Sequence, residues 1–250
     1  AGVIYYIKRW SGDGLVNRKI AEPLMGLALL LVVFFAARHL GMMEAARAQS
    51  RAAAEREQKV VVIDAGHGGN DPGKIGVNDS LEKDINLAVA KKLKAYLENE
   101  DVRVVMTREE DKGLYRDGDR KKKMADLKKR CEIIEKAEPD AVVSIHQNSY
   151  HQAGVSGGQV FYYRNSVKGK RLAELIQDRF SYVLGEENTR LAKSNDTYYL
   201  LLHVKEPIVI VECGFLSNPK EAEMLTDEDY QDRMAWTIHM GIMEYLNEQN

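Results

Sequence analysis

The sequence predicts an α/β protein, with a sheet covered by helices on both faces and a membrane-anchoring or signal segment before it. Along residues 59–250, two sequence patterns alternate with each other, and together they predict the sheet and its helices. Short β-branched runs alternate with segments whose apolar residues recur every three or four positions, and this alternation is typical of α/β sheets. The leading segment is predicted from an uncharged apolar stretch at residues 23–37.

The composition excludes several classes of protein. The 250 residues are 44% hydrophobic and include only 5 prolines and 2 cysteines, which excludes a disordered polar chain, a collagen and a disulfide scaffold. The net charge of −2 argues against a nucleic-acid-binding protein, which would need a strong basic excess. The body after the leader is long enough for one substantial core.

The leader is predicted to have three parts. Its uncharged stretch is shorter than the roughly 18–20 residues of a comfortable membrane span, but flanking charged residues can snorkel and lengthen it. We expect a cytoplasmic segment at 1–22, a short anchor helix at 23–40 and a helical stalk at 41–58. Two alternatives stay open: a signal peptide cleaved after the Ala-Arg-Ala sequence at 46–48, or a buried core helix.

Five runs in the body are predicted to be strands. Each is five or six residues long and rich in valine, isoleucine or aromatic residues, as is typical of strands. The first stops at a glycine-rich loop, which marks it as a short buried strand. The runs are residues 59–64, 102–106, 141–145, 159–163 and 207–211.

Four segments are predicted to be helices, because their apolar residues recur at helical spacing. The stripes lie within residues 81–97, 124–134, 172–183 and 230–245. The second stripe overlaps the basic stretch 120–130, RKKKMADLKKR, whose charge suggests binding to nucleic acid or another anionic polymer. Since its apolar residues form one stripe, we interpret its basic residues as a solvated helix face.

Three predicted strands are followed by residues that can bind a metal ion or act in catalysis. His67 lies in the glycine-rich loop after the first strand, His146 follows the third and Glu212 follows the fifth. Ligands gather outside the carboxyl ends of strands in open α/β sheets, so these side chains can converge. Each has a plainer alternative: a phosphate-holding loop around His67, a core histidine at position 146, and a buried Glu212 paired with a base such as Arg108.

Glu82 is the fourth candidate. Asp79 and Glu82 have the spacing of a capping box, so helix capping is its simplest role. Glu82 also lies in the first turn of a predicted helix, which places its carboxylate near the same edge of the sheet. Two histidines and one carboxylate fit a catalytic zinc site that leaves one position open for water.

The cysteines do not suggest a metal site, because neither belongs to a CxxC pair. Cys131 lies on a helical stripe. Cys213 follows Glu212 on an apolar strand and is predicted to be a buried thiol, with a Cys–His nucleophile as the alternative. We expect no disulfide.

Five blocks of sequence carry a family resemblance. They are DAGHGGNDPG (64–73), EKDINL (82–87), TR (107–108), SIHQN (144–148) and VECGFLSNP (211–219). In this order, and over about residues 59–247, the chain resembles the zinc-dependent N-acetylmuramoyl-L-alanine amidases of the family 3 type.

The resemblance implies a site, a fold and a reaction. One zinc ion would be held by His67, Glu82 and His146, and Glu212 would be the catalytic residue. The fold would be a three-layer sandwich, with a twisted mixed sheet of about six strands between helices. The reaction would be hydrolysis of the peptidoglycan amide that joins the lactyl group of muramic acid to L-alanine. Gln147 stands where the family often has a small residue, which bears on substrate fit and not on the metal.

The implied substrate also places the body of the chain. Basic residues flank the apolar stretch equally on both sides and give no orientation, but peptidoglycan lies outside the membrane. The leader and the VECGFLSNP block are similar to those of sporulation and germination amidases, which implies a role in forming spore-cortex muramic-δ-lactam and an activating protein partner. Two alternatives stay open: a zinc peptidase or deacetylase acting on another cell-wall amide, and a non-catalytic peptidoglycan-binding protein.

Overall fold

The computed structural model describes residues 18–185 and 188–249, which divide into two compact units between Glu57 and Gln58. The second unit is an α/β body built around one six-stranded sheet, so the predicted fold class is confirmed. Its strands are β1 (Val60–Ala65), β2 (Arg103–Met106), β3 (Ala141–Asn148), β4 (Gln159–Tyr162), β5 (Lys193–Ser194) and β6 (Ile208–Phe215). Its helices are α2 (Glu82–Asn99), α3 (Lys122–Ala137), α4 (Val167–Arg179), α5 (Ser181–Leu184), α6 (Tyr199–His203), α7 (Pro219–Thr226) and α8 (Glu228–Glu248).

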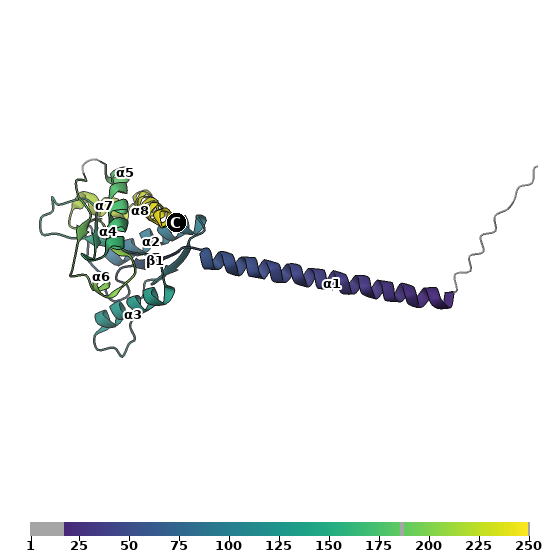
Figure 1. The fold of residues 1–250 in the computed structure, drawn as a ribbon. Helices are drawn as coiled ribbons and strands as arrows, with labels where there is room; N and C mark the ends of the chain where they lie inside the picture. The colour runs from purple at the N-terminus through teal and green to yellow at the C-terminus, as the bar shows by residue number, and fades with distance from the viewer. Residues whose placement is uncertain (1–17, 186–187, 250) are drawn as a thin grey trace, which may run out of the picture. The chain divides into compact units, whose positions relative to one another are not determined.

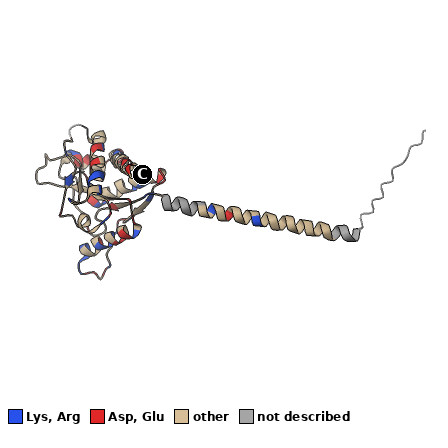
Figure 2. Cartoon of the chain, in the orientation of Figure 1, with Lys and Arg blue, Asp and Glu red and all other residues tan. Residues whose placement is uncertain are grey.

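The first unit contains one long helix, α1 (Arg18–Glu57). Its segment Pro23–Gln49 is long and apolar enough to cross a membrane, and its side chains are exposed. Few charged residues lie on the described part of α1, whereas both signs of charge are spread over the body (Figure 2). The helix is compatible with a membrane anchor or a signal sequence. Residues 1–17 of the predicted cytoplasmic segment lie outside the described residues.

The sheet is mixed, with strand order β2-β1-β3-β6-β4-β5. β2, β1, β3 and β6 run parallel to one another, β4 is antiparallel to β6, and β5 is parallel to β4. The parallel strands therefore end at one edge of the sheet, where their polar residues meet. β3 and β6 run further than predicted, so His146 and Glu212 lie within strands and not beyond them.

Helices cover both faces of the sheet (Figure 1). α2, α4 and α8 pack together on one face, and α3 and α6 lie against the other. Alternate residues of each strand point to opposite faces: Val61 and Ile63 enter the larger apolar core under α2 and α8, whereas Val62 enters the smaller core under α3 and α6. The same alternation directs Asp64, at the end of β1, towards α3.

Candidate metal centre

His67 stands in the loop after β1, where the backbone makes an unusual turn. Its φ of 63° is in the left-handed region, which is costly for a residue with a side chain. Two glycines near His67 leave room for the side chains of His146 and Glu82. A Cβ on Gly66 would lie 2.3 Å from the His146 ring, and a Cβ on Gly73 would lie 2.4 Å from Glu82 Oε2. The glycines of this block therefore let the backbone approach the side chains of the site.

The loop around His67 is not built as a phosphate-holding loop. Its backbone N–H groups already donate to acceptors in the protein: Gly68 to the Asp71 carbonyl, Gly69 to Asp111 Oδ1 and Asn70 to the Tyr115 hydroxyl. An anion-binding loop needs such groups free to point at the ligand. This alternative for the glycine-rich block is therefore wrong.

Glu82 is the first residue of α2, and its side chain does not cap the helix. The N-cap is Leu81, which has no capping side-chain hydrogen bond. The Glu82 carboxylate instead accepts hydrogen bonds from two backbone groups, the N–H of Lys74 to Oε2 at 2.8 Å and the N–H of Gln147 to Oε1 at 3.1 Å. The capping-box interpretation is wrong, because these bonds hold the carboxylate over the edge of the sheet.

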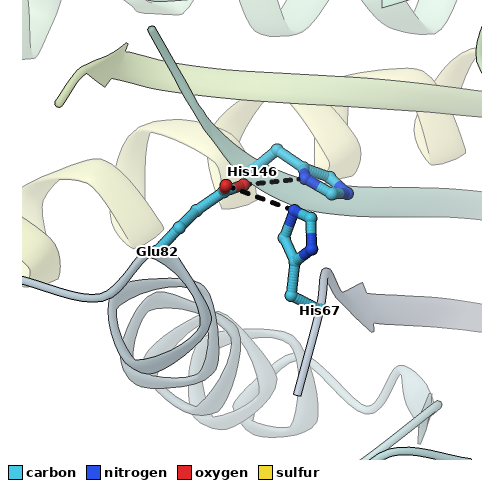
Figure 3. Close-up of side chains that lie close together, drawn as sticks. All are labelled: His67, Glu82 and His146. Atoms are coloured by element: carbon cyan, nitrogen blue, oxygen red, sulfur yellow. Dashed lines mark hydrogen bonds and ion pairs between the residues drawn. The ribbon is translucent and has the colours of Figure 1, made fainter. Parts of the chain in front are cut away.

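His67, Glu82 and His146 point towards one another from a loop, a helix and a strand (Figure 3). His67 Nε2 lies 3.2 Å from Glu82 Oε2, and His146 Nδ1 lies 2.9 Å from Glu82 Oε1. One potential ligand atom from each of the three residues lies within 4.8 Å of the other two. Glu82 is 2% exposed, whereas both histidines are partly open to solvent.

The charges of this cluster favour a bound cation. Burial by itself would raise the pKa of the Glu82 carboxyl, but hydrogen bonds with His146 and His67 outweigh burial and hold the pKa far below its usual value. Burial would lower the pKa of His67, but the contacts with Glu82 and then Asp71 raise it. A buried carboxylate that stays ionised between two imidazoles stabilises positive charge placed among them.

His67 has a second partner that fixes its ring. Asp71 Oδ2 lies 3.0 Å from His67 Nδ1, on the ring nitrogen that does not face Glu82. A carboxylate on the far nitrogen is the usual way in which a metal-binding histidine is oriented. Asp71 was not among the predicted site residues, although it lies in the DAGHGGNDPG block, four residues after His67.

Glu212 lies on β6 directly beside His146 of β3. The hydroxyl of Tyr198 donates to Glu212 Oε1 at 3.0 Å, whereas Oε2 is buried and has no hydrogen-bond partner among the described residues. Burial raises the pKa of the Glu212 carboxyl, and the negative charge of Glu82 adds to this effect. A buried carboxyl with one unpartnered oxygen and a raised pKa is typical of a general acid or base.

The alternative of Glu212 paired with Arg108 is wrong. The Arg108 guanidinium donates to the backbone carbonyls of Ala65, Gly66 and Lys83. It therefore fixes the loop before His67 and the start of α2, and it is a structural residue of the site.

Arg130 is a second buried arginine, so the predicted solvated face of residues 120–130 does not include it. It is 1% exposed and donates to Asp64 Oδ1 at 2.7 Å, to the Ala65 carbonyl at 2.8 Å and to the His67 carbonyl at 2.6 Å. Asp64 also accepts from the Ser144 hydroxyl. Arg130 thus holds His67 in its left-handed conformation.

Substitution of Arg130 by Met should destabilise the body strongly. Asp64 would be left as a buried charge without its cation, and loss of one partner of a buried ion pair costs about 3–5 kcal/mol. Chemical denaturation of the variant and the original chain measures this difference. The exposed Arg120, substituted by Met, is the matched control and should change the free energy of unfolding by less than about 0.5 kcal/mol.

The same ion pair makes stability depend on pH. Burial alone would raise the pKa of the Asp64 carboxyl, but Arg130, Ser144 and Thr107 lower it from 3.8 to about 2. Because the folded pKa is the lower one, we expect this carboxyl to add about 2 kcal/mol to the free energy of unfolding above about pH 5 and to lose that contribution as the pH falls towards 2, which denaturation at a series of pH values would measure.

The cysteines contribute no nucleophile to the site. Both are free thiols, and Cys213 is buried with a pKa raised by burial and by the negative charge of Glu212. A thiol that stays protonated is a poor nucleophile. The alternative of a Cys–His nucleophile therefore loses its basis.

A cavity of about 300 Å³ opens beside the cluster. His67 and His146 form part of its wall, and residues of α3 and α6 form other parts. The cavity is large enough for part of a peptide. Further lining residues are Tyr115, Lys122, Lys123, Leu127 and Leu200.

Comparison with known sequences identifies close relatives. The profile of the N-acetylmuramoyl-L-alanine amidase family matches residues 61–244. The chain is 39% identical over 194 residues to the germination-specific N-acetylmuramoyl-L-alanine amidase of Bacillus subtilis, which covers 76% of this chain and 81% of the relative.

Solved structures of amidases share the fold. The CwlD amidase of Clostridioides difficile, determined in complex with the GerS lipoprotein, has a TM-score of 0.74 and 41% identity, and the match covers 76% of this chain and 100% of that one. The catalytic domain of CwlV, an N-acetylmuramoyl-L-alanine amidase from Bacillus (Paenibacillus) polymyxa var. colistinus, has a TM-score of 0.67 and 34% identity over 76% of this chain and 99% of that domain.

Proposed function

Because the chain belongs to the N-acetylmuramoyl-L-alanine amidase family and is a peptidoglycan amidase, we propose that it uses one zinc ion, held by His67, Glu82 and His146. The observation that carries the proposal is the convergence of these three side chains, with ligand atoms within 4.8 Å of one another. Two imidazoles and a carboxylate are the protein ligands of known catalytic zinc sites. The buried, ionised Glu82 supplies the negative charge that the cation needs.

The reaction assigned to this site is hydrolysis of the amide between the muramic acid lactyl group and L-alanine. When bound, zinc supplies a Lewis acid that polarises a carbonyl and lowers the pKa of water. In this proposal, the cavity of about 300 Å³ beside His67 and His146 receives part of the substrate next to the cluster.

Glu212 carries the proton transfers. Its unpartnered Oε2 accepts a proton from the attacking water and then delivers a proton to the nitrogen of the departing L-alanine. Tyr198 fixes the other oxygen, Oε1, and thereby holds Oε2 in one orientation. The upward direction of the shift in the pKa of Glu212 is the direction needed by a carboxyl group that must both take and give a proton.

Digestion of purified peptidoglycan sacculi tests this function. The full chain should release peptides whose new amino terminus is L-alanine, and a chelator should stop the release. New termini at another residue would indicate a peptidase, and release of acetate would indicate a deacetylase. Binding without release of either would indicate a non-catalytic protein.

We also propose a role in spores, with a protein partner. The support is the similarity to a germination-specific amidase and to CwlD, a protein whose structure was determined with a lipoprotein. The expected role is removal of peptides before muramic-δ-lactam forms in the cortex. Deletion of the gene in a spore-forming host should abolish this lactam, and a normal lactam content would contradict the spore role while leaving the chemistry untouched.

The proposed place of the enzyme is outside the cell membrane, anchored by residues 23–40. The support is the apolar segment of α1 together with a cell-wall substrate. Alkaline phosphatase fused after the last residue should be active in whole cells. An inactive exported reporter would contradict this orientation, and a mature protein that begins near Gln49 would show cleavage of the leader.

A further inference from the structure

Two lysines of the basic stretch 120–130 lie in the wall of the cavity that also contains His67 and His146. They are Lys122, the first residue of α3, and Lys123. The basic residues of this stretch were predicted to form a solvated helix face. Lys123 is exposed and Lys122 is half-buried, but both also border the same cavity as the candidate metal ligands.

The carboxylates of this cavity wall are already partnered. Asp64 and Asp126 both bind Arg130, and Asp126 also accepts from the backbone N–H of Leu114. Asp71 contacts His67. Each acidic side chain of the wall therefore has a hydrogen-bond or ion-pair partner other than a lysine of α3.

The two lysines, in contrast, are not neutralised by an ion pair with any residue that the structure describes. Among the ion pairs of residues 18–185 and 188–249, Lys83 binds Asp111 and Lys129 binds Glu132, but neither Lys122 nor Lys123 has a carboxylate within 4.0 Å. Lys123 acts on Asp71 only through a longer-range charge interaction. The cavity thus presents two positive charges without direct counter-ions.

The position of Lys122 is defined by an aromatic ring. Its Nζ lies 5.0 Å from the centre of the Tyr115 ring, within the range of a cation–π contact. The Tyr115 hydroxyl accepts from the backbone N–H of Asn70, in the loop that carries His67. Lys122 is therefore held at a fixed place relative to the candidate metal ligands.

We propose that Lys122 and Lys123 form a subsite that binds a carboxylate of the substrate's peptide, on the L-alanine side of the amide. This inference rests on the proposed function. In the substrate, the carboxyl group of muramic acid is consumed in the amide, so the N-acetylated glycan part carries no charge. A linear peptide, in contrast, carries at least its terminal carboxylate and gains one with each acidic side chain. The unneutralised lysines therefore match the peptide part.

Synthetic muramoyl-peptides test the subsite with the full, zinc-loaded chain. The peptide begins with L-alanine and contains one acidic side chain, and four versions are compared: both carboxyls free, either one amidated, or both amidated. The original chain should lose about tenfold in kcat/KM when the bound carboxyl is amidated, the effect expected for a hydrogen bond to a charged group. The two singly amidated versions show whether the side-chain or the terminal carboxyl is bound.

Variants at the lysines should remove this discrimination. The double variant Lys122→Gln and Lys123→Gln should have a kcat/KM about tenfold below that of the original chain on the substrate with both carboxyls free. On substrates whose bound carboxyl is amidated, the two proteins should have the same kcat/KM. Lys128→Gln is the matched control, because Lys128 is exposed on the same helix and does not line the cavity. The kcat/KM of this control variant should equal that of the original chain on each of the four substrates.

Three results would overturn the proposal, and they are distinguishable from one another. Equal kcat/KM of the original chain on all four substrates, or an equal loss in the double variant on all four, would overturn the subsite and leave the amidase function standing. No cleavage of these substrates or of sacculi would overturn the proposed function, and the subsite with it.

Discussion

Substitution of Glu212 by Gln should reduce kcat by about 100- to 10,000-fold, the usual contribution of general acid–base catalysis, while the zinc content stays unchanged. The amide of Gln has nearly the shape of the carboxylate and keeps an oxygen for the Tyr198 hydroxyl, which donates to Oε1. It cannot take a proton from water at neutral pH. L-Alanine would then leave as a poorly protonated amine, and hydrolysis would be slow.

The measurement is the rate of peptide release beside the zinc content of the same preparation. Tyr198→Phe serves as a comparison, because it removes the hydrogen bond that orients Glu212 and keeps the carboxylate. Its loss of kcat should be smaller, with zinc again retained. Full zinc and near-normal turnover in the Glu212 variant would exclude Glu212 from the chemistry, and loss of zinc would place it among the metal ligands.

Substitution of His146 by Ala should abolish both zinc binding and activity. The variant would leave only His67 and Glu82, and two ligands do not complete the three-residue set of a catalytic zinc site. His67→Ala should have the same effect. Metal analysis of the purified variants after dialysis, with peptide release from sacculi, checks both expectations.

His203→Ala is the matched control for these variants. His203 lies on α6 and is exposed, and its ring contacts only the backbone carbonyl of Tyr199 among hydrogen-bonding groups of the described chain. It should keep its zinc and its activity. A His146 variant with normal zinc content would contradict the assignment of this residue as a ligand.

The elements of the sheet and its main helices could be predicted because their signals are periodic. The apolar residues of β1 and β6 form continuous buried runs, and those of α2 and α8 form stripes that pack on the larger core. β5, at the edge of the sheet, has only two residues, and α6 has five. Segments this short do not repeat their period, so no pattern marks them, and the five predicted strands did not include β5.

The candidate ligands could be proposed from sequence, but the interactions that position them could not. His67, His146 and Glu212 each follow an apolar run, which directs them to one edge of the sheet. Asp79 and Glu82 have the same spacing as a capping box, and only the approach of Lys74 and Gln147 shows that the carboxylate points elsewhere.

Arg130 and Lys122 show the limit of charge patterns. Both lie in one basic stretch, yet Arg130 is buried against Asp64 whereas Lys122 borders the cavity. The helical period of α3 distributes these side chains over different faces, but period alone does not reveal which face meets a carboxylate. For Arg130, the buried partner Asp64 lies 66 positions earlier in the sequence.

Titration of the metal-stripped chain with zinc tests the central claim most directly, with release of L-alanine-terminated peptide from sacculi as the readout. Activity should be absent after removal of the metal, rise in proportion to added zinc and stop rising at one equivalent, and the His146→Ala variant should not respond. Full activity of the metal-stripped chain, or a rise that continues to two equivalents, would contradict a single zinc ion held by His67, Glu82 and His146.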